Sequence, residues 1–319
     1  MTLAIVFCLL YISKYNYLLR GINTIYLTGH TTAYLEDYKK FSNDTVFASR
    51  FPQPWPLHDQ YNQFAPSKLI EDYHKDRKTV TYLVIKNDSI LYEKYYHGYG
   101  TYSKSNSFSV VKSVISALMG IAIKEGVIQS LDQKVVDFIP ELKGSYAQDV
   151  TVGDLSSMAS GQEWIEEYYN PFSVTSASYF VKDLDALILD QQINQRPGES
   201  FQYKSGTTQL LGMVIKKATG KSLSVYMTEK LWQPMGAEHS ALWQLDSSEN
   251  GMEKAFCCLA TNARDFARIG KLYKNYGQWN GTQLLDSAFI ARSIQPRLRK
   301  ILNTDMGCGW MNFKTKKYL

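Results

Sequence analysis

The longest apolar run in the middle of the chain lies between Val110 and Ile123, where nearly every side chain is Val, Ile, Leu, Met or Ala. At 100° per residue, the exceptions fall on one narrow helical stripe that comprises Ser109, Lys112, Ser113, Ser116 and Gly120. A helix that is apolar on nearly all sides is a buried helix. The pattern therefore predicts a buried helix that starts near Ser109 and ends at Gly126, a glycine suited to the C-cap.

Two segments before this helix have the character of strands. Residues 79–85 and 89–96 are rich in β-branched and aromatic side chains, and the turn 86–88 separates them. They predict an antiparallel hairpin. A helix is expected to begin the domain at 67–75, and further helices are expected after residue 151 and at 183–190, 209–218, 222–232 and 263–276, with a return to strand near 306–313.

This order of elements predicts an α+β fold. An antiparallel sheet is flanked by helices, and a helical lobe is inserted into it. The cleft between the lobe and the sheet is the expected site.

The first twenty residues have a different pattern. Residues 1–13 carry no charged side chain, and residues 3–12 are almost wholly apolar. The run is short for a membrane span of about 20 residues, and no basic residues precede it as they do in a signal peptide. We interpret residues 1–20 as a membrane signal or anchor with a clipped start, which predicts an exported, membrane-anchored, periplasmic or extracellular protein. The alternative is a buried N-terminal helix.

Residues 21–66 show little periodicity and contain the Pro-Gln-Pro-Trp-Pro run at 52–56. Such a run cannot continue a helix or a central strand. We expect an extended lead-in that either lies against the domain or links it to the membrane. The domain proper is then 67–319.

The composition is that of a globular protein, and it gives no sign of nucleic-acid binding or of a metal site. The 319 residues are 45% hydrophobic and 20% charged, which allows a sizeable core, and the net charge of +5 is spread along the chain. No basic stripe indicates nucleic-acid binding. Four cysteines give neither a metal spacing nor a disulfide framework, and a bridge between the adjacent Cys257 and Cys258 is expected to be too strained. We therefore predict no metal and no cofactor, and the sequence does not indicate an oligomeric state.

The candidate chemistry begins with Ser109-x-x-Lys112 at the start of the buried helix. A lysine in such a helix is costly unless it is paired or its pKa is lowered. A neutral lysine one turn from a serine hydroxyl can activate that hydroxyl without a histidine. The alternative is coincidence, because roughly one or two Ser-x-x-Lys motifs are expected by chance in a chain of this size.

A second motif, Tyr203-x-Ser205-Gly206, stands directly before a predicted helix. With Ser109-x-x-Lys112 before it, the order resembles the serine β-lactamase and penicillin-binding-protein superfamily, and most of all the branch of class C β-lactamase-related esterases and 6-aminohexanoate-dimer hydrolases. Further similar stretches cover 92–95, 155–161, 231–236 and 263–268, so the resemblance spans about residues 80–310.

The resemblance implies a role for each motif residue. Ser109 is the nucleophile that forms an acyl-enzyme, and its own N–H is one oxyanion donor. Lys112 takes the hydroxyl proton, and Tyr203 relays it to the leaving group, with its phenol acidified by Lys112. The alternative for Tyr203 is a buried strand tyrosine, since the chain has 23 tyrosines.

Other expectations concern the substrate and the end of the domain. Ser205 stands where classical class C members have Asn, as in some esterase-like relatives, which disfavours classical β-lactams. The loop residues Trp164, Tyr168 and Tyr169 either wall the substrate site or pack under the lobe. The superfamily's last motif is Lys-Thr-Gly or His-x-Gly, whereas residues 314–316 read Lys-Thr-Lys. We therefore expect the domain to be incomplete at the C-terminus, without part of the sheet and half of the oxyanion hole.

The sequence thus predicts a serine hydrolase that cleaves a small-molecule amide or ester and contacts the membrane through its N-terminus. The first alternative is a catalytically impaired homologue or fragment that binds peptide or cell-wall-like ligands without turnover. A structural membrane-anchored protein is the second alternative.

Overall fold

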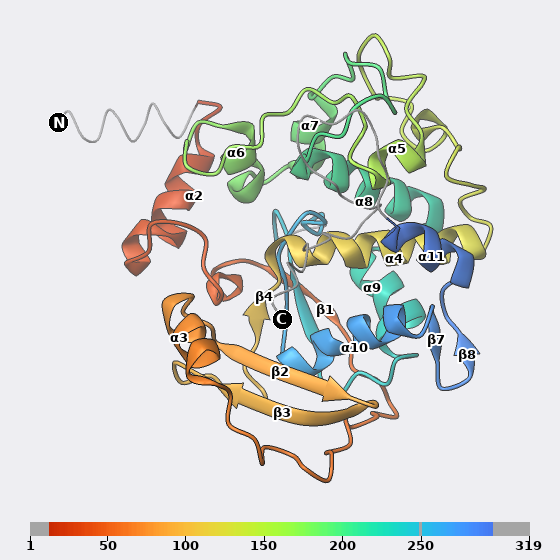
Figure 1. Ribbon diagram of the computed structural model, residues 1–319. Helices are drawn as coiled ribbons and strands as arrows, with labels where there is room; N and C mark the ends of the chain where they lie inside the picture. The colour runs from red at the N-terminus through yellow and green to blue at the C-terminus, as the bar shows by residue number, and fades with distance from the viewer. Residues whose placement is uncertain (1–12, 249–250, 296–319) are drawn as a thin grey trace, which may run out of the picture.

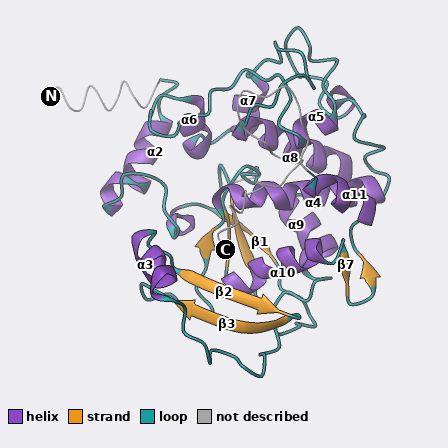
Figure 2. Cartoon of the chain, in the orientation of Figure 1, coloured by secondary structure: helices purple, strands orange, loops and turns teal. Residues whose placement is uncertain are grey.

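The computed structural model describes residues 13–248 and 251–295, in which antiparallel strands are flanked by helices (Figure 1). The expected α+β class is confirmed. Most helices lie in the centre and upper part of the view, whereas the hairpin β2–β3 lies at the lower edge with α3 beside it (Figure 2).

The principal sheet has four antiparallel strands in the order β1-β5-β6-β4. These strands are β1 (Asn43–Val46), β5 (Ala241–Gln244), β6 (Leu259–Thr261) and β4 (Ser105–Asn106). The strand β4 ends two residues before the turn that carries Ser109, so the sheet anchors the start of that turn.

The predicted hairpin is confirmed as β2 (Thr81–Lys86) and β3 (Ser89–Tyr95). Its turn residues Asn87 and Asp88 have φ angles of 48° and 60°, which these two residue types tolerate better than most and which suit a tight hairpin. A small third sheet pairs β7 (Gln278–Trp279) with β8 (Thr282–Gln283).

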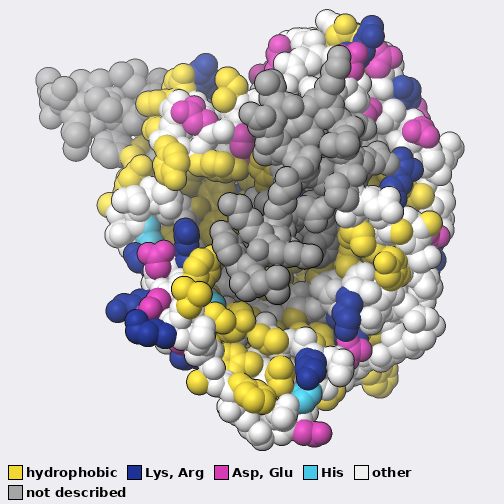
Figure 3. All heavy atoms as spheres, in the orientation of Figure 1, with side chains coloured by type: hydrophobic (Ala, Val, Ile, Leu, Met, Phe, Trp, Pro, Cys, Tyr) yellow, Lys and Arg dark blue, Asp and Glu magenta, His cyan; other side chains and the backbone are white. Residues whose placement is uncertain are grey.

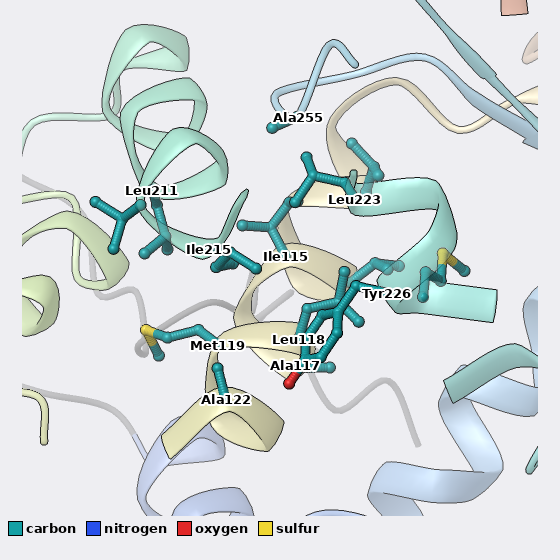
Figure 4. Packing of buried hydrophobic residues seen from close by; sticks show 14 of the residues in the cluster. Ile115, Ala117, Leu118, Met119, Ala122, Leu211, Ile215, Leu223, Tyr226 and Ala255 are labelled. Carbon is teal, nitrogen blue, oxygen red and sulfur yellow. The ribbon is translucent and has the colours of Figure 1, made fainter. Parts of the chain in front are cut away.

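The central helix α4 (Val111–Lys124) is buried as predicted. It packs between α8 (Ser205–Thr219) and α9 (Leu223–Met227), and Ile115 and Leu118 have no exposed surface (Figure 4). Gly126 follows the end of the helix with φ 75°, a conformation that glycine adopts without strain. A 3₁₀ turn, η3 (Phe108–Val110), leads into α4, so Ser109 precedes the α-helix instead of lying within it.

The remaining helices surround this core, and several begin at the capping residues that the sequence offers. Thr151 forms a capping box with Asp154, and Ser222 and Asn262 cap the helices that follow them. These helices are α3 (Lys68–Asp76), α5 (Val152–Ser156), α6 (Val174–Phe180), α7 (Leu184–Leu189), α10 (Ala263–Lys274) and α11 (Ser287–Ile294), with η4 (Val135–Asp137) and the π-helical turn η5 (Thr228–Trp232).

The segment 21–66 differs from the expected extended lead-in. The segment begins within α2 (Tyr17–Thr24). It then contains η1 (Tyr26–Thr28), η2 (Asp37–Lys40) and the strand β1. β1 has no alternating pattern, and its pairing with β5 outweighs its weak strand propensity. The proline-rich part has no helix or named strand, and there the Ile90 N–H donates to the Pro56 carbonyl at 2.8 Å.

Three regions named from the sequence fall outside the described residues: the apolar run 3–12, the strand expected near 306–313 and the segment 314–316. Across residues 13–248 and 251–295, no helix combines the length and the apolar character needed to cross a membrane.

Arg268 connects its own helix, α10, to two segments that are distant in sequence. Its guanidinium is buried and donates to the Asp265 carboxylate at 2.8 Å, the Met235 carbonyl at 3.0 Å and the Gln53 carbonyl at 2.7 Å. Removal of one partner of a buried ion pair leaves the other charge uncompensated.

We therefore predict that Arg268→Ala lowers the free energy of unfolding by about 3–5 kcal/mol in urea denaturation followed by circular dichroism. The control is Arg196→Ala, because Arg196 is exposed and its ion pair with Glu199 is 3.6 Å long. That variant should change the free energy by less than about 1 kcal/mol. Equal losses in the two variants would contradict the structural role of Arg268.

Candidate active site

Three side chains from two separate parts of the chain meet at the hydroxyl of Ser109. The Lys112 ammonium nitrogen donates to Ser109 Oγ at 3.2 Å, and the Tyr203 hydroxyl donates to the same oxygen at 2.8 Å. The i,i+3 spacing places Lys112 next to Ser109 at the helix start. Tyr203 comes from the segment directly before α8, which packs against α4.

The backbone at this point is strained. Phe108, directly before Ser109, has φ 43°, which is a rare conformation for a large aromatic residue. Among the described residues, no acceptor pairs with the N–H of Ser109. This N–H lies in the first turn at the start of the helix, where backbone N–H groups have no partner within the helix.

Lys112 is 7% exposed, and its ammonium nitrogen also donates to the Phe256 carbonyl at 2.7 Å. Burial lowers the pKa of Lys112 to about 7, and the carboxylate of Glu166 opposes this shift. A large share of the amine is therefore neutral near pH 7 and can accept a proton from the adjacent hydroxyl.

The expectation that Lys112 acidifies Tyr203 is wrong. Burial raises the pKa of the Tyr203 phenol, the hydrogen bond to Ser109 opposes this, and the carboxylate of Glu166 raises the pKa further. The amine that was expected to lower the phenol pKa is itself partly neutral, so burial decides the direction. Tyr203 is therefore a protonated donor at neutral pH.

Glu166 is a site residue that the sequence analysis missed. Its carboxylate accepts four hydrogen bonds, from Trp164 Nε1 at 2.7 Å, the Tyr168 hydroxyl at 2.6 Å, and the N–H and hydroxyl of Ser205 at 2.7 and 2.6 Å. It thereby joins the aromatic loop to the start of α8. Ser205 is 39 residues away in sequence, so no spacing rule relates it to Glu166. The available signal was a carboxylate between the aromatic residues of a loop that the sequence analysis named as a candidate wall of the substrate site.

Trp164 and Tyr169 take different positions. Trp164 is 6% exposed and packs on Gly206, where an added Cβ would lie 2.4 Å from its ring. The glycine of the Tyr203-x-Ser205-Gly206 motif thus makes room for this indole. Trp164 lines neither of the two pockets at Ser109, which differs from the expected substrate wall, whereas the exposed Tyr169 lines one of them.

Two pockets open at Ser109 and Lys112, each of about 690 Å³. The first contains Tyr203 and lies between Leu83 of β2, Leu155 of α5 and Phe266 of α10, so it occupies the expected cleft between lobe and sheet. The second lies on the side of α2 and α6 and contains Ser205. Hydrophobic side chains border a hollow on the face of the molecule that Figure 3 shows.

The expectation that Cys257 and Cys258 stay unbridged is wrong, because the structure joins them in a disulfide. Cys258 has φ 78°, and this reversal of the backbone accompanies the bridge. The pair follows Phe256, whose carbonyl accepts from Lys112. Within the described parts of the chain, no three His, Cys, Asp or Glu side chains gather as metal ligands do.

Comparison with known proteins gives a family match and distant relatives. The family model described as Beta-lactamase matches residues 67–312. The chain is 25% identical over 248 residues to the 6-aminohexanoate-dimer hydrolase of Paenarthrobacter ureafaciens. The aligned region covers 75% of this chain and 62% of that protein. It is 27% identical over 174 residues to Protein flp of Staphylococcus aureus, which covers 51% of this chain and 34% of that protein. The chain therefore spans less than two thirds of the length of both relatives.

Solved structures agree on the fold. A Bacillus anthracis protein assigned to the 6-aminohexanoate-dimer hydrolases superposes with a TM-score of 0.69 at 23% identity, covering 88% of this chain and 74% of that one. A penicillin-binding-protein homologue of Pyrococcus abyssi gives a TM-score of 0.56 at 18% identity, covering 76% and 63%.

The lowered pKa of Lys112 predicts a pH-dependent stability. Below about pH 7 the amine is protonated in both the folded and the unfolded chain. Between about 7 and its ordinary value of 10.5, the unfolded chain binds more protons, so the free energy of unfolding rises with pH. Lys112→Met lacks this contribution.

We therefore predict that the native chain gains stability relative to Lys112→Met between about pH 6.5 and about pH 9.5, as measured by urea denaturation. Lys124→Met, at the exposed end of the same helix, is the control and should keep a constant difference from the native chain. A constant difference for Lys112→Met as well would show that the amine titrates normally.

Proposed function

This chain belongs to the Beta-lactamase family, and we propose that it is a serine hydrolase that cleaves an amide or ester bond through an acyl-enzyme on Ser109. One observation carries the proposal. The Ser109 hydroxyl accepts hydrogen bonds from both Lys112, three residues away in sequence, and Tyr203, 94 residues away. A hydroxyl between an amine of lowered pKa and a protonated phenol has a proton acceptor and a proton donor within reach.

In the proposed acylation, Ser109 Oγ attacks the carbonyl carbon while its proton passes to the neutral amine of Lys112. The oxygen of the tetrahedral intermediate carries the negative charge, and the N–H of Ser109 is placed to donate to it. The bond to the leaving group then breaks. Tyr203 donates its proton to the leaving group and recovers one from Lys112, which returns both residues to their initial states.

Deacylation uses the same groups in reverse order. A water molecule attacks the acyl carbon and loses a proton toward Tyr203 and Lys112. The bond from the acyl carbon to Ser109 Oγ breaks, and the oxygen regains its proton. The products are a carboxylic acid and the free serine, so atoms and protons balance.

The substrate that we propose is a small-molecule linear amide or an ester. Ser205 in the Tyr203 motif supports this choice over a classical β-lactam, as does the name of the 25% identical relative, a 6-aminohexanoate-dimer hydrolase. The second candidate is ligand binding without turnover. The sequence Lys-Thr-Lys at 314–316, which has lysine where the superfamily's last motif has glycine, favours this second candidate.

We also propose export or membrane attachment through residues 1–20, on the strength of the apolar run 3–12 alone. Fractionation of cells that make the full chain tests this. Recovery of the protein only with the cytoplasmic fraction would contradict it.

A fluorophosphonate probe tests the acyl-enzyme directly. We predict that the native chain gains one probe mass on Ser109, that Ser109→Ala gains none, and that Lys112→Met reacts about 100-fold or more slowly, because Lys112 takes the hydroxyl proton. Because Lys112 must be neutral to take the proton, the rate of labelling should rise with pH through about 7 and then level off. Intact-protein mass spectrometry and peptide mapping measure the label.

Ser130→Ala, in the connection after α4, is the matched serine control and should label as the native chain does. A folded native chain that leaves Ser109 unlabelled, yet binds hydrolysable amides or esters, would favour the candidate function without turnover. Labelling that persists in Ser109→Ala would place the nucleophile elsewhere.

A further inference from the structure

We propose that the second pocket is an acyl-binding site for an uncharged, apolar chain, and that the segment 17–33 forms one of its walls. This inference rests on the proposed function, since it identifies which part of the substrate lies on which side of Ser109. It adds a substrate preference that the reaction itself does not require.

The pocket starts at the nucleophile and is walled by two helices. Ser109, Lys112 and Ser205 line the pocket where it meets the nucleophile. Residues of α2, of α6 and of the aromatic loop at 164–172 line most of the rest. Hydrophobic side chains predominate, as they do in pockets that hold apolar ligands. They include Tyr17, Ile22, Ile25, Tyr169 and Phe180.

The wall from α2 is fixed against α6. The Tyr17 hydroxyl donates to the Pro171 carbonyl at 3.0 Å, and an added Cβ at Gly21 would lie 3.4 Å from the Phe180 ring. These residues precede 67–312, the part that matches the family. The pocket is therefore completed by a segment outside the matched region.

Charge separates this pocket from its neighbour. Among the described residues that line it, Lys112 is the only Lys, Arg, Asp or Glu. The first pocket has Asp88, Lys271 and Lys274 among its lining residues. A cationic substrate group in the second pocket would lose its hydration without gaining a partner.

Two carboxylates lie close to the lining, but both are already paired. Glu166 accepts the four hydrogen bonds described above. The buried Asp37 accepts from Asn106 at 3.0 Å, Tyr179 at 2.6 Å and Gln244 at 3.0 Å. Neither is among the residues that line the pocket.

The position of Tyr203 assigns the acyl side. In the proposed reaction, Tyr203 donates its proton to the leaving group. Tyr203 lines the first pocket and not the second. The leaving group therefore lies toward the first pocket, and the acyl chain extends into the second.

Two esters of equal chain length test the proposal: p-nitrophenyl hexanoate and p-nitrophenyl 6-aminohexanoate. The leaving group is the same, and only the terminal ammonium differs. For the native chain we expect kcat/KM to be at least about tenfold higher for the hexanoate, because the ammonium loses its hydration in the pocket. Equal values for the two esters would overturn the proposal.

A carboxylate placed in the pocket should remove the preference. Ile22 lines the pocket and is 37% exposed, so Ile22→Asp is expected to fold. This variant should lower the hexanoate to 6-aminohexanoate ratio about tenfold or more, by pairing with the ammonium. Leu27→Asp is the control, because Leu27 is 75% exposed and does not line the pocket, and it should keep the native ratio. An unchanged ratio in Ile22→Asp would overturn the assignment of the pocket.

A binding measurement on a variant that cannot be acylated tests the pocket independently of the proposed reaction. The affinities of hexanamide and 6-aminohexanamide for Ser109→Ala can be measured by NMR titration. Tighter binding of hexanamide that Ile22→Asp reverses supports the pocket even if the native chain is never acylated. Acylation of Ser109 with no preference between the two amides keeps the reaction and rejects the pocket.

Discussion

The burial of the Lys112 amine is the constraint on which the site depends. A solvated lysine is charged at neutral pH and cannot take a proton from a hydroxyl. Here α8 and α9 cover α4 from both sides, and burial lowers the pKa of Lys112 to about 7. The core residues Ile115 and Leu118 therefore contribute to function as well as to stability, because they hold the helix that keeps the amine away from water.

Because the amine is buried, its hydrogen-bond partners must come from the protein and must lie at the right distance. The Phe256 carbonyl accepts a hydrogen bond from the amine at 2.7 Å, and Ser109 Oγ lies 3.2 Å from the same nitrogen. The strained φ of 43° at Phe108 turns the chain from the sheet into η3 and presents Ser109 to both Lys112 and Tyr203. Such strain persists only where the surroundings fix it, here by β4 before the turn and by α4 after it.

The parts of the fold with a clear periodicity could be predicted from the sequence. The buried helix, the hairpin and the proximity of Ser109 to Lys112 follow from spacings of three to four residues or from alternation. The strand β1 could not be predicted, since its residues form a strand only because β5 offers a partner. Glu166 was missed for a related reason, because its partner Ser205 is distant in sequence. The pKa of Tyr203 depends on burial and on the charge state of Lys112, and the sequence specifies neither.

Proton transfer from Ser109 to Lys112 would create a positive charge in a buried place, so the site needs groups that stabilise it there. The Tyr203 ring centroid lies 5.0 Å from the lysine nitrogen and the Phe256 ring centroid 5.9 Å, both within range of a cation–π interaction. The Phe256 carbonyl accepts from the charged amine, and the carboxylate of Glu166 favours the charged form. Burial disfavours the charge and the carboxylate of Glu166 favours it, and because burial dominates, the pKa of Lys112 is lowered to about 7. An amine with this balance is neutral often enough to accept the proton and can hold it until the leaving group takes it. Because Glu166 also orders Tyr168 and Ser205, one side chain links this charge balance to the shape of the second pocket.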